Sequence, residues 1–250
     1  MTAVAQAVGT VPEIAIAFDV PNLERALALD ETLGPGPELA KVGLELFTAA
    51  GPDVVRALRE RGRRVFLDLK LHDIPNTVRG AAASAGRLGV DLLTVHAMGG
   101  HGMVAAAVAG AAESGARTRV VAVTVLTSLD AFSLPPGFQR PFHSMIVIAQ
   151  LADLVEAAGA HGIVCAASDL PPMMAFRRRP VFAVTPGIRP AGSATHDQAR
   201  VTTVDEAVAM GSSLLVLGRA VTAASDPRAA LAAARAERDK AFHAKSSPTG

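Results

Sequence analysis

The feature that most constrains the fold is a repeat of short apolar runs separated by alanine-rich segments. The runs are rich in Val, Ile and Leu, whereas the segments between them have the length and spacing of amphipathic helices. Eight runs occur, at residues 14–20, 39–46, 64–71, 92–97, 120–126, 162–167, 181–188 and 214–221. This alternation is typical of βα units on a parallel sheet. Eight units in 250 residues predict an α/β fold, a single-domain (β/α)8 or TIM barrel.

The repeat does not decide whether the sheet closes, so a doubly wound open sheet is the alternative. No Ser/Gly-rich linker divides the chain, and residues 1–239 are therefore assigned to one barrel domain. Residues 240–250 are polar and rich in small residues, which predicts a flexible C-terminal tail.

Charge and composition argue against several classes of function. The chain carries 24 basic and 23 acidic side chains, and the net charge of +1 argues against binding to nucleic acid. No apolar run approaches the ~20 residues needed to cross a bilayer, and the N-terminus lacks the positively charged region of a signal peptide. Cys165 is the only cysteine, which excludes an intrachain disulfide and fits a reducing compartment. These features predict a cytoplasmic protein without a membrane or nucleic-acid partner.

Polar side chains gather at the C-terminal ends of the predicted strands. In a barrel these ends meet at one mouth, where active sites are built. The candidates that would converge there are Asp19, Lys41, Asp68, Lys70, His96, Thr127, Ser128 and Arg219. Glu45, which follows Lys41 in the second run, is expected to be its structural partner.

The third run continues into a charged segment, FLDLKLHDIPNT at residues 66–77. The two-residue period of a strand places Asp68 and Lys70 on the inner face and the leucines against the helices. Taken alone, an Asp-x-Lys pair is most often a structural ion pair. Asp73 favours a catalytic role, because a lysine among carboxylates should stay protonated. Such a lysine is a poor Schiff-base nucleophile and a good proton donor.

The histidines near this segment are predicted to have structural roles. His72 should point away from Asp68 and Lys70, as a structural or supporting imidazole. His96 and His101 lack the Asp, Glu or Cys neighbours that would complete a metal site. No metal site is therefore predicted.

A second group of polar residues follows the last two runs. The seventh run ends in a Gly/Pro turn with Arg189, the loop at residues 189–200 supplies Gln198, and the eighth run ends in Gly218 and Arg219. Arginine side chains and glycine amides at this place in a barrel suit a phosphate group. Neither a G-x-x-x-x-G-K-[ST] loop nor a G-x-G-x-x-G turn is present, so a nucleotide cofactor held by those motifs is not supported.

Residues 68–77, DLKLHDIPNT, resemble the signature of the orotidine 5'-phosphate decarboxylases, D-x-K-x-x-D-I-P-N-T, at every fixed position. The resemblance extends over nearly the whole chain, in the order and spacing of the bacterial branch. It includes Asp19, Lys41, His96, Ser128, VTPGIRP at residues 184–190, Asp197, Gln198 and Arg219. Related sugar-phosphate barrels share D-x-K-x-x-D, whereas the I-P-N-T extension and the late phosphate motifs are more specific.

The resemblance implies decarboxylation of orotidine 5'-phosphate to UMP, the last step of de novo pyrimidine synthesis, without a metal or organic cofactor. It gives catalysis to Lys70, which faces and protonates the C6 carbanion, and to Asp68 and Asp73, which hold the lysine. The implied substrate contacts are Asp19 and Lys41 at the ribose, Thr127 and Ser128 at the pyrimidine edge, Arg189, Gln198, Gly218 and Arg219 at the phosphate, together with Ile74, Asn76, Thr77 and Pro186.

The resemblance also implies a homodimer whose active sites are shared, with Asp73 and Thr77 reaching into the site of the neighbouring subunit. Two other functions stay open. A related barrel could act on a sugar phosphate with a metal at D-x-K-x-x-D, although I-P-N-T argues against it. A silent barrel could bind nucleotides without turnover, although the intact set of Asp68, Lys70 and Asp73 argues against that. Residues 131–145 have no assigned role.

Overall fold

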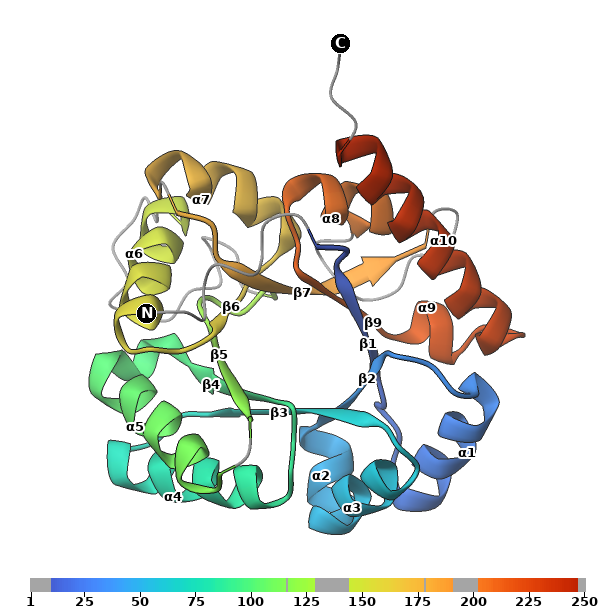
Figure 1. The fold of residues 1–250 in the computed structure, drawn as a ribbon, viewed down its shortest axis with the longest axis horizontal. Helices are drawn as coiled ribbons and strands as arrows, with labels where there is room; N and C mark the ends of the chain where they lie inside the picture. The colour runs from blue at the N-terminus through green and yellow to red at the C-terminus, as the bar shows by residue number, and fades with distance from the viewer. Residues whose placement is uncertain (1–9, 116, 129–143, 178, 191–201, 247–250) are drawn as a thin grey trace.

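The protein is described by a computed structural model, in which residues 10–115, 117–128, 144–177, 179–190 and 202–246 are described. Figure 1 shows a ring of strands surrounded by helices. The strands are β1 (Glu13–Ala17), β2 (Leu39–Gly43), β3 (Arg64–Leu71), β4 (Leu92–His96), β5 (Arg119–Val123), β6 (Gly162–Val164), β7 (Phe182–Arg189), β8 (Thr202–Thr203) and β9 (Leu214–Leu217).

The sheet is parallel and closed, as the predicted barrel requires. Neighbouring strands pair in sequence from β1 to β7, β9 pairs with both β7 and β1, and these contacts complete the ring. The two-residue strand β8 pairs only with β7 and lies outside the ring. Closure removes the sheet edges, so the open-sheet alternative is wrong. The (β/α)8 single-domain prediction is confirmed.

The helices cover the outer face of the ring (Figure 1). They are α1 (Leu23–Leu33), α2 (Leu44–Ala50), α3 (Pro52–Glu60), α4 (Pro75–Arg87), α5 (Gly100–Glu113), α6 (Ser144–Ala157), α7 (Leu170–Phe176), α8 (Val204–Met210), α9 (Arg219–Thr222) and α10 (Pro227–Ser246), with short 3-10 turns η1 (Ala97–Gly99) and η2 (Ala167–Asp169). Helical structure in α10 extends through Ser246, into the segment that the sequence analysis assigned to a tail.

Several strands end earlier than the apolar runs that predicted them. β2 stops at Gly43, and Leu44 already belongs to α2, so Glu45 lies exposed on a helix. β9 stops at Leu217, and Arg219 begins α9. The expectation that Glu45 is the partner of Lys41 is therefore wrong, since Lys41 pairs with Asp19 and Asp68 instead.

The apolar core has two parts that follow the alternation of each strand. Inward side chains fill the barrel, among them Phe66, Leu92 and Val216. Outward side chains, such as Leu67 and Leu93, pack beneath the helices. The core is therefore layered as expected for a barrel that is filled rather than hollow.

Helices α4 and α5 pack closely against each other. Gly110 of α5 faces the main chain of Arg79 in α4. A Cβ atom built on Gly110 would overlap the carbonyl oxygen of Arg79, so any side chain here would force the two helices apart.

Candidate active site

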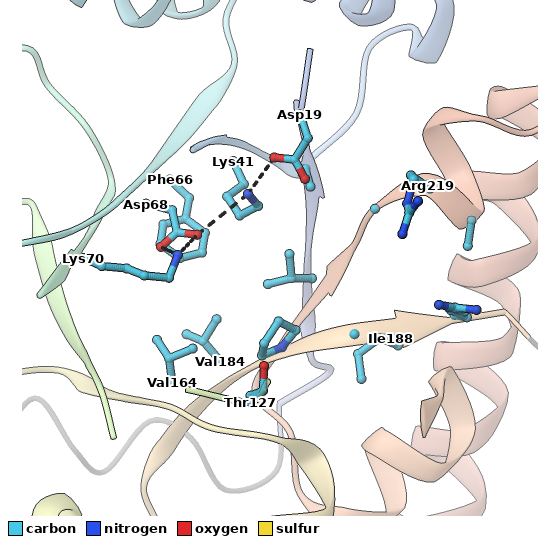
Figure 2. Close-up of a pocket in the computed structure, with 17 residues that line it drawn as sticks. Asp19, Lys41, Phe66, Asp68, Lys70, Thr127, Val164, Val184, Ile188 and Arg219 are labelled. Carbon is cyan, nitrogen blue, oxygen red and sulfur yellow. Dashed lines mark hydrogen bonds and ion pairs between the residues drawn. The ribbon is translucent and has the colours of Figure 1, made fainter. Parts of the chain in front are cut away.

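A cavity of about 260 Å³ opens at the C-terminal ends of the strands. Figure 2 shows its charged side chains together with apolar side chains from inside the barrel, among them Phe66, Val164 and Val184. The lining residues are Ala17, Asp19, Lys41, Phe66, Asp68, Lys70, Thr127, Val164, Val184, Pro186, Gly187, Ile188, Arg189, Val216, Gly218, Arg219 and Ala220. Most of the side chains predicted to converge at the barrel mouth therefore do so.

Four of these side chains form a row of alternating charge. Lys41 Nζ lies 3.1 Å from Asp19 Oδ1 and 3.7 Å from Asp68 Oδ2. Lys70 Nζ donates to both Asp68 oxygens, at 2.9 and 2.8 Å. Figure 2 shows Lys41 between the two aspartates, with the Lys70 side chain reaching toward Asp68. Asp68 is buried, and the ammonium groups of Lys41 and Lys70, one on each side, compensate its negative charge.

The backbone is irregular where β3 delivers Asp68 and Lys70. Pairing with β4 passes from Leu67↔Leu93 to Leu71↔Val95, so β3 advances four residues while β4 advances two. Lys70 has a φ of 51°, and among the described residues it is the one non-glycine with positive φ. This conformation costs about 1–3 kcal/mol and is typical of functional sites. A bulge of this kind re-aims side chains, here toward the cavity.

Thr94 of β4 supports this irregular segment and was missed by the sequence analysis. Its hydroxyl accepts the backbone N–H of Lys70 at 2.8 Å and donates to Asp68 Oδ1 at 2.9 Å. Thr94 is completely buried. The sequence does contain one indication of this role. Thr94 lies in the fourth apolar run, two residues before His96, and therefore on the same inward face of the strand.

The opposite side of the cavity contains the residues predicted for a phosphate. Arg189 and Pro186 of β7 line it with Gly218 and Arg219, and Figure 2 shows Arg219 across the cavity from Lys70. The β7 backbone bulges here too, because Thr185↔Leu215 is followed by Ile188↔Leu217. Gly187 has a φ of 79°, which favours glycine, and it lines the cavity although the sequence analysis did not name it. Gln198 lies outside the described residues.

The two residues predicted at the pyrimidine edge are placed differently. Thr127 lines the cavity, whereas Ser128 is exposed and is not among the lining residues.

The turn that leads from β3 into α4 lies on the surface of the chain. Asp73 and Ile74 of this turn are exposed, as are Asn76 and Thr77 at the start of α4, and none of the four lines the cavity. The Asp73 carboxylate accepts the backbone N–H of Ile74 at 2.6 Å. Within the described chain, Asp73 therefore lies apart from the Asp68–Lys70 pair.

His72 and His96 stack beside the charged row, with ring centroids 5.3 Å apart. Burial, followed by the nearby His72 and Lys70 charges, lowers the pKa of His96 below its ordinary value. Its Nδ1 atom is buried and has no hydrogen-bond partner among the described residues. A neutral ring is favoured there, because a second cation would face Lys70. This arrangement fits the supporting role predicted for His72.

No cluster of three or more His, Cys, Asp or Glu side chains suited to a metal ion occurs in the described part of the chain. Among the same residues, no helix combines the length and apolar character needed to cross a membrane.

Comparisons with known proteins agree with this geometry. Residues 12–234 match the family described as "Orotidine 5'-phosphate decarboxylase / HUMPS family". An orotidine 5'-phosphate decarboxylase of Anaeromyxobacter sp. (strain K) is 51% identical over 218 residues, covering 87% of this chain and 94% of that protein. The enzyme of the same name from Cutibacterium acnes is 47% identical over 220 residues, covering 88% of this chain and 93% of that protein.

A solved structure of similar fold points the same way. The crystal structure of orotidine 5'-phosphate decarboxylase from Lactobacillus acidophilus is 35% identical and superposes with a TM-score of 0.79, covering 92% of this chain and 100% of that one. The similarity thus spans the barrel and its mouth rather than one motif. The chain belongs to the orotidine 5'-phosphate decarboxylase / HUMPS family.

Proposed function

We propose that this protein decarboxylates orotidine 5'-phosphate to UMP, with Lys70 as the central catalytic residue. The observation that carries the proposal is the ammonium of Lys70, held by Asp68 at 2.8 Å on the wall of a cavity whose far side contains Arg189 and Arg219. Arginines at one end suit the phosphate of a nucleotide, and a fixed ammonium at the other end suits a base from which a carboxylate is lost. The two similar decarboxylases named above, of which the chain covers more than 90%, support the same substrate.

The reaction requires stabilisation of a poorly delocalised carbanion. Cleavage of the bond between C6 and the carboxylate releases CO2 and leaves the electron pair on C6. The Lys70 ammonium lies where that charge develops, and it then transfers a proton to C6, which gives UMP. Lys70 recovers its proton from solvent. Asp68 keeps the lysine in place and repels the substrate carboxylate, which favours its departure.

The other contacts orient the nucleotide. Asp19 and Lys41 are proposed at the ribose hydroxyls, and Thr127 and Ser128 at the pyrimidine edge. Arg189, Gln198, Gly218 and Arg219 are proposed at the phosphate, with Pro186 shaping that end. Remote binding energy of this kind raises turnover when it organises the reacting groups.

The exposed turn before α4 supports a homodimer with shared sites. Ile74 is 66% exposed, and Leu44, Met98 and Leu126, which follow β2, β4 and β5, are exposed apolar residues at the same end of the barrel. Apolar residues gathered at one end favour contact with another protein surface. We propose that Asp73 and Thr77, with Ile74 and Asn76, complete the site of the neighbouring subunit.

Mixing two inactive variants tests this sharing. Lys70→Ala and Asp73→Ala should each lack activity alone, and a mixture refolded or co-expressed as dimers should recover about a quarter of the wild-type activity, since heterodimers contain one intact site. Recovery of no activity, with heterodimers demonstrated by tag exchange, would place Asp73 in its own subunit's site, whereas full activity of Asp73→Ala alone would remove Asp73 from catalysis.

One assay decides the proposed reaction. Purified protein in EDTA should consume orotidine 5'-phosphate, followed as loss of its absorbance, and should produce UMP and CO2. Loss of activity in chelator would favour a metal-dependent sugar-phosphate reaction, and UMP binding without turnover would favour a silent nucleotide-binding barrel. The single buried cysteine and a substrate of nucleotide synthesis support a cytoplasmic location.

A further inference from the structure

We propose that Thr94 is a positioning residue, which sets the backbone of Lys70 and the carboxylate plane of Asp68 through one hydroxyl. The inference rests on the proposed decarboxylase function and adds a residue that contacts the catalytic pair from a neighbouring strand. Thr94 does not line the cavity. Its influence on the reaction must therefore pass through Asp68 and Lys70.

The first step of the argument is the backbone of β3. Between Leu67 and Leu71 the regular pairing with β4 is interrupted, and Lys70 lies within this interruption. The Thr94 hydroxyl accepts this N–H at 2.8 Å in place of a carbonyl oxygen. A buried N–H left without an acceptor is costly, so this bond favours the left-handed conformation that Lys70 adopts.

The second step is the direction of the hydroxyl proton. Because Thr94 Oγ1 accepts from the Lys70 backbone, its own hydrogen is free to point at Asp68 Oδ1, 2.9 Å away. Both Asp68 oxygens also accept from Lys70 Nζ. The carboxylate is thus held by Thr94 from β4 and by the lysine from its own strand, which leaves it one orientation.

The third step is the consequence for the ammonium. The main chain and the counter-ion of Lys70 are fixed by the same oxygen atom, so a shift at Thr94 displaces both ends of the lysine together. Catalytic groups lose activity steeply with displacement, and a misplacement of about 1 Å lowers rates by roughly 100-fold. Arg219, proposed for the phosphate, lies across the cavity from Lys70 (Figure 2), and Thr94 is not among the lining residues.

Thr94→Val tests the inference, because valine has the shape of threonine without the hydroxyl. We expect kcat to fall about 100-fold, while the affinity for UMP, measured by calorimetry, stays close to that of the wild type. Thr94→Ser keeps the hydroxyl and should recover most of the lost turnover. Thr124 provides the control. It is also a completely buried threonine, and its hydroxyl donates to the Val164 carbonyl rather than to Asp68.

The controls separate positioning from folding and from the proposed function. Thr124→Val should melt at a temperature similar to that of Thr94→Val while retaining wild-type kcat. The inference is overturned if Thr94→Val keeps wild-type turnover, if Thr94→Ser is as impaired as Thr94→Val, or if UMP affinity and melting temperature fall in step with kcat. A wild-type protein that fails to decarboxylate orotidine 5'-phosphate refutes the proposed function instead, before any Thr94 variant is measured.

Discussion

The two mouths of the barrel both contain networks of charged side chains, but they differ in what the charges face. At the N-terminal mouth, Glu13, Arg64, Arg119 and Phe182 are the first residues of β1, β3, β5 and β7. Glu13 accepts from Arg64 at 2.7 Å and from Arg119 at 3.3 Å. The Arg119 guanidinium lies 5.3 Å from the centre of the Phe182 ring, which also packs against His161. Alternate strands thus supply one closed layer, as expected in a filled barrel.

At the C-terminal mouth the charges are similar in kind, but the strand that carries Asp68 and Lys70 is irregular. The row from Asp19 to Lys70 ends at a cation on the wall of the cavity.

The ion pairs of the N-terminal mouth also change the pKa of a carboxyl group. Although burial alone would raise the pKa of Glu13, its hydrogen bonds with Arg64 and the charge of Arg119 lower it below its usual range. The comparison teaches that ion pairing alone does not identify an active site. The irregular backbone at Lys70 distinguishes the proposed catalytic mouth from the N-terminal one.

The largest effect expected from this difference is produced by Lys70→Ala. Removal of both the electrostatic stabilisation and the proton donor should reduce kcat by more than about 10⁴-fold. Folding should survive, because Asp68 keeps Lys41 as a neighbour at 3.7 Å. Steady-state kinetics and circular dichroism measure the two results. Substantial remaining decarboxylation would remove Lys70 from the role proposed here.

The next effect concerns the far side of the same mouth. Arg219→Ala should lower kcat as well as raise KM, with a loss in kcat/KM of about 10- to 100-fold, because a charge-assisted bond to phosphate is removed. Arg228→Ala is a suitable control, since Arg228 is an exposed arginine on α10 that does not line the cavity. Turnover unchanged at saturating substrate would mean that Arg219 only tethers the nucleotide.

A substitution at the N-terminal mouth should affect stability and spare catalysis. Glu13→Gln removes the shared partner of Arg64 and Arg119, and both arginines are only partly exposed. After allowance for solvent screening, the free energy of unfolding should fall by about 1–2 kcal/mol, measured by urea denaturation. The value of kcat should not change. An altered kcat with intact folding would show that the two mouths are coupled through the barrel.

The effect that should be smallest at neutral pH, and grow as the pH falls, comes from His161 at the same mouth. Burial, then the positive charge of Arg119, lowers the pKa of His161 to about 4, although Glu13 acts in the opposite direction. Between the unfolded pKa of about 6.5 and the folded pKa of about 4, the unfolded chain binds more protons, so stability falls as pH decreases.

His161→Gln should flatten this part of the stability curve, since glutamine does not titrate. Thermal melts of both proteins from pH 7 to pH 4 measure the difference. Equal slopes would show that carboxylates such as Glu13, rather than the imidazole, determine the acid response.

Much of the architecture could be predicted because the barrel depends on patterns that repeat. The eight apolar runs and their spacing indicate βα units, and the inward position of Asp68 follows from strand alternation. The repeat alone could not decide closure, because closure depends on the pairing of β9 with β1, which is far away in the chain, and with β7. The early strand ends at Gly43 and Leu217 were missed, because apolar residues continue into the following helices.

The residues of the candidate site that belong to a sequence motif could be predicted. The features that depend on backbone geometry could not. A positive φ at Lys70 has no sequence signal, since lysine rarely adopts it. Thr94 was missed because one threonine in an apolar strand is compatible with simple burial, and its role depends on the register slip in β3. The placement of Asp73 on the surface depends on the course of the turn, which the motif does not specify.

The contact between Gly110 and the main chain of Arg79 has a consequence for mutational scanning of this protein. Substitution of Gly110 should be as poorly tolerated as substitution of Lys70, although Gly110 is a helix residue that does not line the cavity. A selection for cell growth would score the two positions alike. Separating them requires a second measurement of how much folded protein accumulates, which should fall for Gly110 variants and persist for Lys70 variants.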